Sequence, residues 1–254
     1  MKAAEYIQRG IAKSKKRDFD NAIADYQKAI EIEPDSYIAY YQWGDALFSQ
    51  NNYWDFASFV EEDYNEIYEK FHKVIEITTE IIKDNPNDVN AFLYRGKAKQ
   101  ELRHKRAESI DDFSRIIEID PFNIEAYTCR AFSRSRIDDY SGAIEDYTKI
   151  IDIDGNNDIA YQKRAYNRVD NKDFTGAIED CLSAVKINPN NYFAYRCHGN
   201  AKAMTGFYHE AIEKYTLAIE TGNDPYDYFI RAYTKRNIND IDGAIQDYLK
   251  AIDK

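Results

Sequence analysis

The residues that most often carry chemistry are few in this chain and lie far apart. They are His72, His104, His198, His209, Cys129, Cys181 and Cys197. Cys197 and His198 are adjacent, but neighbours on a helix point about 100° apart and cannot easily bind one metal ion. The sequence contains no HExxH metal site, no glycine-rich phosphate loop and no GxSxG nucleophile motif. We therefore expect no catalytic residue, no metal, no cofactor and no enzymatic activity.

A set of charged side chains recurs regularly along the sequence, as an arginine followed about 16 residues later by an aspartate. The five pairs are Arg9 with Asp25, Arg95 with Asp112, Arg130 with Asp146, Arg164 with Asp180, and Arg231 with Asp247. At two further places the arginine position holds Trp43 or His198, and the aspartate position holds Ile77 or Lys214. Because an unpaired charge is costly to desolvate, we expect each pair to form a partly buried structural ion pair. The alternative left open is that the arginine row binds an anionic ligand.

These pairs require elements that repeat at the same interval. A small residue follows each arginine position, at Gly10, Gly44, Gly96, Ala131, Ala165, Gly199 and Ala232, with spacings of 34, 52, 35, 34, 34 and 33. A second series stands at Ala22, Val74, Ser109, Ala143, Ala177, Ala211 and Ala244. Apolar residues recur between them at three- and four-residue intervals, which is typical of paired amphipathic helices. The small residues are where two helix backbones approach closely.

Composition limits the possible partners. The 254 residues carry 34 Lys and Arg against 45 Asp and Glu, a net charge of −11, so no basic field favours nucleic acid. The 10 glycines and 5 prolines are too few for an all-β domain, which favours helices with short connections. No run approaches the length of a membrane span, and residues 1–20 lack the apolar stretch of a secretory signal. We expect a cytoplasmic protein.

The repeated pattern resembles the tetratricopeptide repeat (TPR) family. Its landmark residues in the first unit are Tyr6, Gly10, Ala22, Tyr26, Ala29 and Pro34. The resemblance implies an all-α fold, a right-handed superhelical solenoid of seven helix-turn-helix units. We expect one domain, 1–254, with repeats at about 3–36, 37–88, 89–123, 124–157, 158–191, 192–224 and 225–254.

The second repeat contains an insertion. Its spacing of 52 leaves 18 extra residues, which we place within 52–71 as an N-terminal extension of the second helix. Eighteen residues are five whole turns, so the helix face stays in phase. The resulting apolar seam includes Tyr53, Val60, Tyr64, Ile67 and Phe71. It either folds against neighbouring repeats or forms an assembly surface for a dimer or a partner.

The resemblance also implies a function, as a non-enzymatic scaffold that binds a peptide or helix of a partner protein in its concave groove. The expected groove residues are Tyr41, Lys97, Phe132, Arg136, Tyr166, Phe193, Arg196, Asn200, Tyr226, Phe229, Tyr233 and Arg236. Aromatic and arginine side chains dominate binding energy at interfaces. The alternatives are an accessory subunit that assembles through the second repeat and, less favoured, a sensor of small anions.

One partner known for the family is disfavoured. The clamp that grips the C-terminal tails of chaperones requires a Lys–Asn pair on one helix and a further Asn on the next. Arg196 with Asn200 resembles the first pair, but Ile230 stands where the second asparagine is required. The identity of the partner is open.

Overall fold

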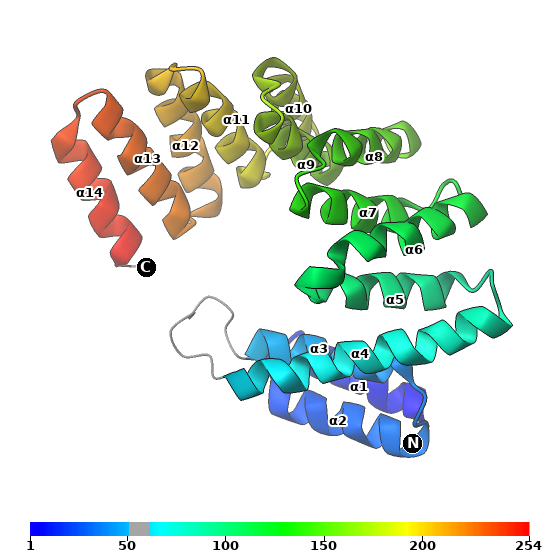
Figure 1. Cartoon of the computed structure of the whole chain (residues 1–254). Coiled ribbons are helices and arrows are strands. Elements are labelled where there is room, and N and C mark those ends of the chain that lie inside the picture. Colours follow the sequence, from blue (N-terminus) through cyan, green and yellow to red (C-terminus); the bar gives the residue numbers. More distant parts are fainter. Residues whose placement is uncertain (51–60, 254) are drawn as a thin grey trace. The chain divides into compact units, whose positions relative to one another are not determined.

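The computed structural model describes residues 1–50 and 61–253, with backbone alone for residues 61–64. Within this part of the chain there are fourteen α-helices, one 3₁₀ turn (Arg103–Lys105) and no strand (Figure 1). The helices are α1 Ala3–Ser14, α2 Phe19–Ile32, α3 Tyr37–Gln50, α4 Glu61–Asp84, α5 Val89–Glu101, α6 Arg106–Ile119, α7 Ile124–Arg136, α8 Tyr140–Ile153, α9 Asp158–Asp170, α10 Phe174–Ile187, α11 Tyr192–Met204, α12 Tyr208–Gly222, α13 Pro225–Asn237 and α14 Ile241–Ile252. The predicted all-α class is confirmed.

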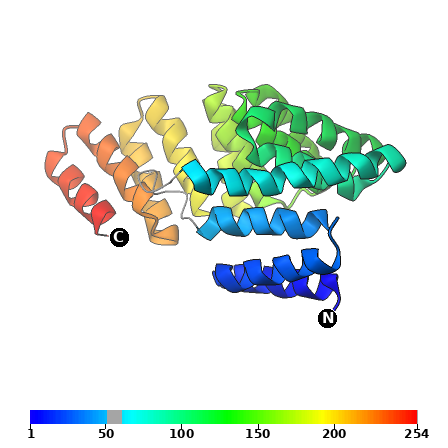
Figure 2. The ribbon, with the colours of Figure 1, turned by 60° about the horizontal axis from the view of Figure 1, so that its bottom comes forward.

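The helices form two compact units, Met1–Ser133 and Arg134–Lys254, whose boundary falls inside α7. In the first unit each helix from α1 to α6 packs against the next, and in the second unit the same holds from α8 to α14. Figure 2 shows this for the first unit, where the blue and cyan helices lie side by side. Sequential packing of helical pairs is the arrangement of an α-solenoid. The single-domain organisation and the count of seven repeats stay predictions.

The turns within the helical pairs are built alike. Asp139, Asp173 and Asp240 each cap the second helix by accepting a hydrogen bond of 3.0 Å from the backbone N–H three residues later. The residue before each cap, for example Lys172, has a positive φ of about 60°. A left-handed residue followed by a capping aspartate ends one helix and begins the next within a few residues.

Four of the small residues, Gly10, Gly44, Gly96 and Gly199, lie against an aromatic ring of the second helix, in line with the predicted close approach of the two helices. A Cβ added to Gly10 would come within 2.4 Å of Tyr26, and one added to Gly199 within 2.5 Å of Tyr215. Such separations are far below van der Waals contact, so a larger residue would push the two helices apart. Tyr26 is fully buried.

The second repeat departs from the predicted register. A Cβ added to Gly44 would lie 3.0 Å from the Phe71 ring and 3.4 Å from Lys70. Ile67 and Lys70 therefore take the places that we assigned to Val74 and Ile77, and Phe71 takes the aromatic position that this assignment would give to Thr78. The position opposite Trp43 is therefore Lys70, and the assignment of Ile77 is wrong. The Lys70 Nζ lies 4.3 Å from the centroid of the Trp43 ring, a cation–π contact in place of an ion pair.

Helix α4 carries two registers, seven residues apart. Phe71 packs under Gly44 of α3, whereas Thr79 meets Arg95 of α5, which is the contact expected when Val74 is the reference. Seven residues are about two turns, so both registers use the same helix face. The 18 extra residues therefore fall on both sides of Ile67. From Gly44 to Ile67 the chain advances 23 residues, whereas the equivalent step in the first repeat, from Gly10 to Ala22, takes 12, so 11 of the extra residues precede Ile67. From Ile67 to Gly96 it advances 29 residues, against 22 from Ala22 to Gly44, so the other seven follow it.

This placement corrects the predicted insertion and its assembly surface. The extra residues do not all lie within 52–71. Ile67 and Phe71 are each 1% exposed, in a core that includes Val74 and Leu102, so they cannot form a surface for another molecule. Tyr53 and Val60 lie outside the described residues, as does the side chain of Tyr64.

We expect Phe71→Ala to destabilise the chain by about 3–5 kcal/mol, because it removes a fully buried ring that also spaces α3 from α4. The measurement is the free energy of unfolding in urea. Phe122→Ala is the matched control, since Phe122 is 75% exposed, and it should change the free energy by no more than about 0.5 kcal/mol. Equal effects of the two substitutions would contradict the register described here.

Candidate partner-binding site

The structure brings four of the predicted arginine–aspartate pairs together. The guanidinium Nη2 lies 2.6 Å from the carboxylate in the pairs Arg9–Asp25, Arg95–Asp112 and Arg231–Asp247, and 2.7 Å in Arg164–Asp180. All four aspartates are about 2% exposed. Arg130 and Asp146 belong to different units, so their pairing stays a prediction.

Each of these aspartates also binds a second cation, four residues after the arginine, which the sequence analysis missed. The contacts are Lys13–Asp25 at 2.8 Å, Lys99–Asp112 at 2.8 Å, Arg168–Asp180 at 3.0 Å and Lys235–Asp247 at 2.9 Å. Asp146 receives the equivalent contact from Arg134 at 3.0 Å. We call this arrangement, a buried aspartate with an arginine and a second cation, the aspartate clamp. The recurring basic residue at the fourth position was a sequence signal for it.

The arginine of the clamp reaches a third helix. Its Nη1 donates to a hydroxyl on the second helix of the preceding pair, as Arg164 does to Thr148 at 3.0 Å and Arg231 to Thr216 at 2.9 Å. Arg130 donates to Ser114 at 2.9 Å in the same way. These arginines are thus engaged by protein acceptors, which favours the structural interpretation of the row over the binding of an external anion.

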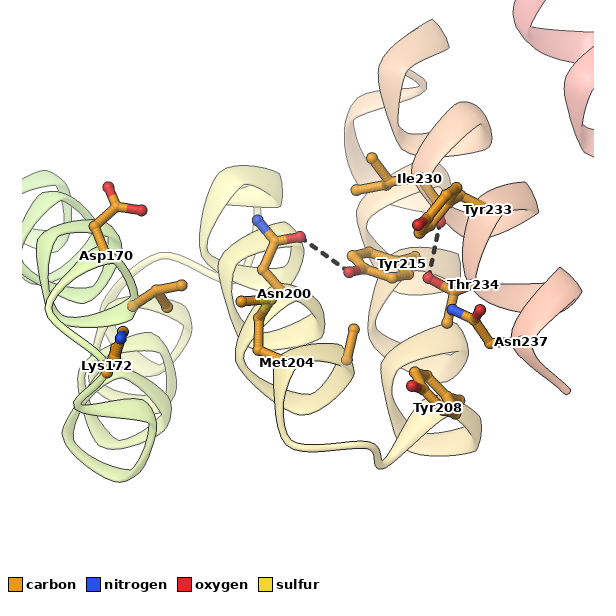
Figure 3. Close-up of a pocket in the computed structure, with 12 residues that line it drawn as sticks. Asp170, Lys172, Asn200, Met204, Tyr208, Tyr215, Ile230, Tyr233, Thr234 and Asn237 are labelled. Carbon is orange, nitrogen blue, oxygen red and sulfur yellow. Dashed lines mark hydrogen bonds between the residues drawn. The ribbon is translucent and has the colours of Figure 1, made fainter.

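A pocket of about 680 Å³ opens in the second unit, where the ends of α9, α11 and α13 converge with α12 (Figure 3). Its lining residues are Val169, Asp170, Lys172, Asn200, Ala203, Met204, Tyr208, Tyr215, Ile230, Tyr233, Thr234 and Asn237. Of these, Asn200 and Tyr233 were predicted groove residues. Most of the others lie near helix ends or on α12, where the periodicity of the first helices does not select them.

The amide of Asn200 is held in one orientation within the pocket. Tyr215, on α12, donates its hydroxyl to Asn200 Oδ1 at 2.9 Å (Figure 3). Burial raises the pKa of Tyr215, so the hydroxyl keeps its proton and remains a donor. With Oδ1 engaged, Nδ2 of Asn200 makes no hydrogen bond to a described residue. An oriented amide donor beside an apolar wall suits a ligand that offers a carbonyl oxygen.

Exposed aromatic rings line the same helices. Tyr226, Phe229 and Tyr233 of α13 are 53%, 48% and 56% exposed, and Phe193 of α11 is 38% exposed. Tyr226 and Phe229 stack with their centroids 6.4 Å apart. Tyr166 donates its hydroxyl to the carbonyl of Phe193 at 3.3 Å. Phe193, Tyr226, Phe229 and Tyr233 are therefore accessible side chains of the second unit, whereas Tyr166 is partly buried.

Arg196 differs from its neighbours. It is 7% exposed, and it binds the carboxylates of Asp227 in α13 and, at 2.6 Å, of Asp224, the N-cap of α13. The guanidinium also lies 5.0 Å from the ring of Phe193 and 5.2 Å from that of Tyr226. Arg196 consequently joins α11 to α13, and its charge is not available to a ligand. The prediction that it is a groove contact is wrong.

The other predicted groove residues are scattered. In the first unit Tyr41 packs against Phe71 and Tyr94, with centroids 5.7 and 5.4 Å apart, while Lys97 forms an ion pair of 2.6 Å with Glu125. Phe132 is 41% exposed. In the second unit Arg136 and Arg236 are exposed, and Arg236 lies 5.9 Å from the Tyr233 ring.

Within the described residues, no three histidine, cysteine or acidic side chains gather in a way that could hold a metal ion. The helices of residues 1–50 and 61–253 include none that is long and apolar enough to cross a membrane. Cys129, Cys181 and Cys197 are free thiols.

The fold defines a class, the helical-repeat proteins built from helix-turn-helix pairs, and comparison with known proteins narrows it. The tetratricopeptide repeat family model matches residues 3–36. A crystal structure of a tetratricopeptide repeat protein from Parabacteroides merdae ATCC 43184 is similar with a TM-score of 0.68 and 16% identity, over 99% of this chain and 92% of that chain. No curated protein sequence matches.

Two structures of MamA are also similar. The crystal structure of MamA has a TM-score of 0.57 and 22% identity over 65% of this chain and 96% of that chain. MamA 41-end from Desulfovibrio magneticus RS-1 has a TM-score of 0.53 and 14% identity over 62% and 93%. The first helical pair is thus a tetratricopeptide repeat by sequence, and the fold of the chain is that of tetratricopeptide repeat proteins, which confirms the predicted resemblance.

We expect Asp180→Ala to destabilise the chain by about 3–5 kcal/mol, because Arg164 and Arg168 would lose the carboxylate that offsets their desolvation. The free energy of unfolding in urea measures this. Asp152→Ala removes an aspartate whose ion pair with Lys149 is exposed, and it should cost at most about 1 kcal/mol. A loss at Asp180 no larger than that at Asp152 would mean that the clamp is not structural.

The clamp should also make stability depend on pH. The hydrogen bond from Arg9 lowers the pKa of Asp25 from 3.8 to about 2, so the folded chain binds fewer protons than the unfolded chain between these values. This contribution is fully present above about pH 5 and is lost as the pH falls toward 2. Asp25→Asn should flatten the fall in unfolding free energy between about pH 4 and 2 relative to the wild type, measured by circular dichroism. Parallel curves would contradict the assignment.

Proposed function

We propose that this chain is a non-enzymatic scaffold whose second unit binds a segment of a partner protein. The tetratricopeptide repeat fold supports a scaffold role in protein interaction. The observation that supports binding of a partner segment by the second unit is the pocket at the ends of α9, α11 and α13, with the oriented Asn200 amide in its wall. Its volume lies within the range of about 300–1,000 Å³ that is typical of ligand pockets.

The chemistry of the pocket favours a polypeptide ligand. Val169, Ala203, Met204 and Ile230 supply apolar wall, which suits the side chain of a bound segment. Asn200 offers an N–H to a backbone carbonyl, a group that recurs along every peptide whatever its sequence.

The exposed rings of α13 extend the surface beyond the pocket. Tyr226 and Phe229 do not line it, yet they stand on the same helix as Tyr233 and are about half exposed. A contiguous row of exposed aromatic side chains is more than a small ligand needs and is typical of protein interfaces. We therefore infer that the ligand is an extended peptide or a helix that contacts both the pocket and this row.

The alternative of assembly through the second repeat has less support. The two described side chains of its predicted seam, Ile67 and Phe71, are buried in the core of the first unit. A fold-back of the insertion against its neighbours, the other interpretation of the apolar seam, agrees with this burial.

The proposal is tested by selecting peptides from a random displayed library on the immobilised full chain and measuring their affinity by fluorescence polarisation. We expect Tyr233→Ala and Asn200→Ala each to weaken binding, Tyr233→Ala by roughly thirtyfold, or about 2 kcal/mol, as for an interface hot spot. Tyr233 is 56% exposed, so its truncation should leave the fold intact. Asn200→Ala removes the acceptor of the buried Tyr215 hydroxyl, so this variant is first shown to be folded by circular dichroism.

Phe122→Ala serves as the control, because it removes an exposed ring of the first unit and should leave the affinity unchanged. Peptides whose binding survives both pocket substitutions, or a library that yields none above background, would overturn the proposal.

A further inference from the structure

The pair α11–α12 keeps the layout of the aspartate clamp but not its carboxylate. Its arginine position holds His198, its second-cation position Lys202, and its aspartate position Lys214. In the four clamps whose pairs are formed, the carboxylate at this place lies 2.6–3.0 Å from two cationic groups. Here all three positions carry nitrogen, and the central acceptor of the clamp is missing from the chain.

The three side chains are only partly matched by protein acceptors. Lys202 Nζ lies 2.6 Å from Glu210 Oε2, a carboxylate at the start of α12 whose side chain is 49% exposed. His198 is 7% exposed, and neither it nor Lys214 forms a hydrogen bond or ion pair with a described residue. One half-exposed carboxylate therefore faces two lysines and a buried imidazole.

The electrostatics of the group agree with this imbalance. Burial, together with the charges of Lys214 and Lys202, lowers the pKa of His198 to about 4, although Glu210 acts in the opposite direction. The imidazole is thus neutral near pH 7, with one ring nitrogen able to donate. Lys202, His198 and Lys214 also lower the pKa of Glu210. The local field is positive despite the net charge of −11 on the chain.

We propose that His198, Lys202 and Lys214 form a binding site for an oxyanion, a carboxylate or phosphate group, which takes the place of the missing aspartate. The preceding helix supports this interpretation. In two clamps the arginine donates a hydrogen bond to a threonine of the preceding helix, Thr148 or Thr216. The equivalent position of α10, the helix before His198, holds Leu182, which has no acceptor in its side chain. Both acceptors that tie a clamp arginine into the stack, the aspartate and the hydroxyl on the preceding helix, are thus absent here.

The site differs from the peptide pocket. Asn200 is two residues along α11 from His198, and on a helix this separation places the two side chains about 160° apart in direction, since each residue turns by about 100°. None of the three proposed ligands lines the pocket. An anion here does not depend on the proposed peptide function, and either can fail alone.

Inorganic phosphate and sodium acetate, titrated separately into the full chain at constant ionic strength near pH 7, test the site. The readouts are the chemical shifts of the His198 imidazole and the midpoint of thermal unfolding. We expect a saturable shift of the His198 resonance, a rise in its pKa because an anion stabilises the imidazolium, and a higher unfolding midpoint. A response to phosphate alone, to acetate alone or to both would support the site and identify the preferred oxyanion.

Lys214→Ala should reduce the affinity for the anion at least tenfold. The double variant His198→Arg/Lys214→Asp restores an internal carboxylate and arginine, as in Arg231–Asp247, so it should fold and lose the response of the unfolding midpoint to anions. Lys149→Ala removes an exposed lysine elsewhere and should leave the response intact. The proposal is overturned if His198 shows no saturable shift with either anion, or if the double variant is stabilised as much as the wild type.

Discussion

A carboxylate that is buried must be matched by cations, and in this chain that requirement organises the helical stack. Removing Asp25, Asp112, Asp180 and Asp247 from water is favourable only because two cationic groups lie within 3.0 Å of each. Both cations come from the first helix of the pair, four residues apart and thus on one face. The aspartate therefore fixes which face of the first helix meets the second, and at which height. Its effect is mainly on register, since buried ion pairs add little net stability.

The same arginine links successive pairs. Because its Nη1 reaches Thr148 or Thr216 on the preceding helix, one guanidinium sets both the packing within a pair and the packing between pairs. Where the arginine is replaced, the aspartate and the hydroxyl on the preceding helix are replaced as well. Trp43 faces Lys70 and follows a helix with Gln27 at the hydroxyl position, and His198 faces Lys214 and follows Leu182. An arginine without the aspartate would leave a buried charge unmatched, and at every repeat of the sequence the two residues are present or absent together, although the α11–α12 pair keeps Lys202 at the second-cation position.

The limits of sequence reasoning follow from the same physics. The small residues and the Arg–Asp pairing could be predicted, because each is a local requirement that repeats at a fixed interval. The register of α4 could not, since a shift by seven residues brings an equivalent apolar face to the same side and Phe71 and Thr78 then compete equally. The prediction for Arg196 was wrong because helical periodicity gives the direction of a side chain but not its partners. Those partners, Asp227 of α13 and its N-cap Asp224, lie in the next helical pair. The pocket depends on where helices end, which periodicity leaves uncertain by a few residues.

On the first helix of each pair, three consecutive residues have different roles, because two of them pack against the second helix and the third does not. The residue at the clamp position faces the second helix, the small residue after it lies where the two helices approach closely, and the following residue points about 100° further round. In the second unit that third position is Tyr166, Asn200 or Tyr233, whose side chains lie in or beside the candidate groove. None of them belongs to the clamp, so they can differ in size, charge and hydrogen bonding without altering the helix spacing. The repeats can therefore keep one architecture while the surface that they present varies from helix to helix. The side chain of Asn200, for example, is oriented by a hydrogen bond from Tyr215, whose ring also packs against Gly199. The rigid part of the repeat thus orients the variable part, which is the property that a binding scaffold requires.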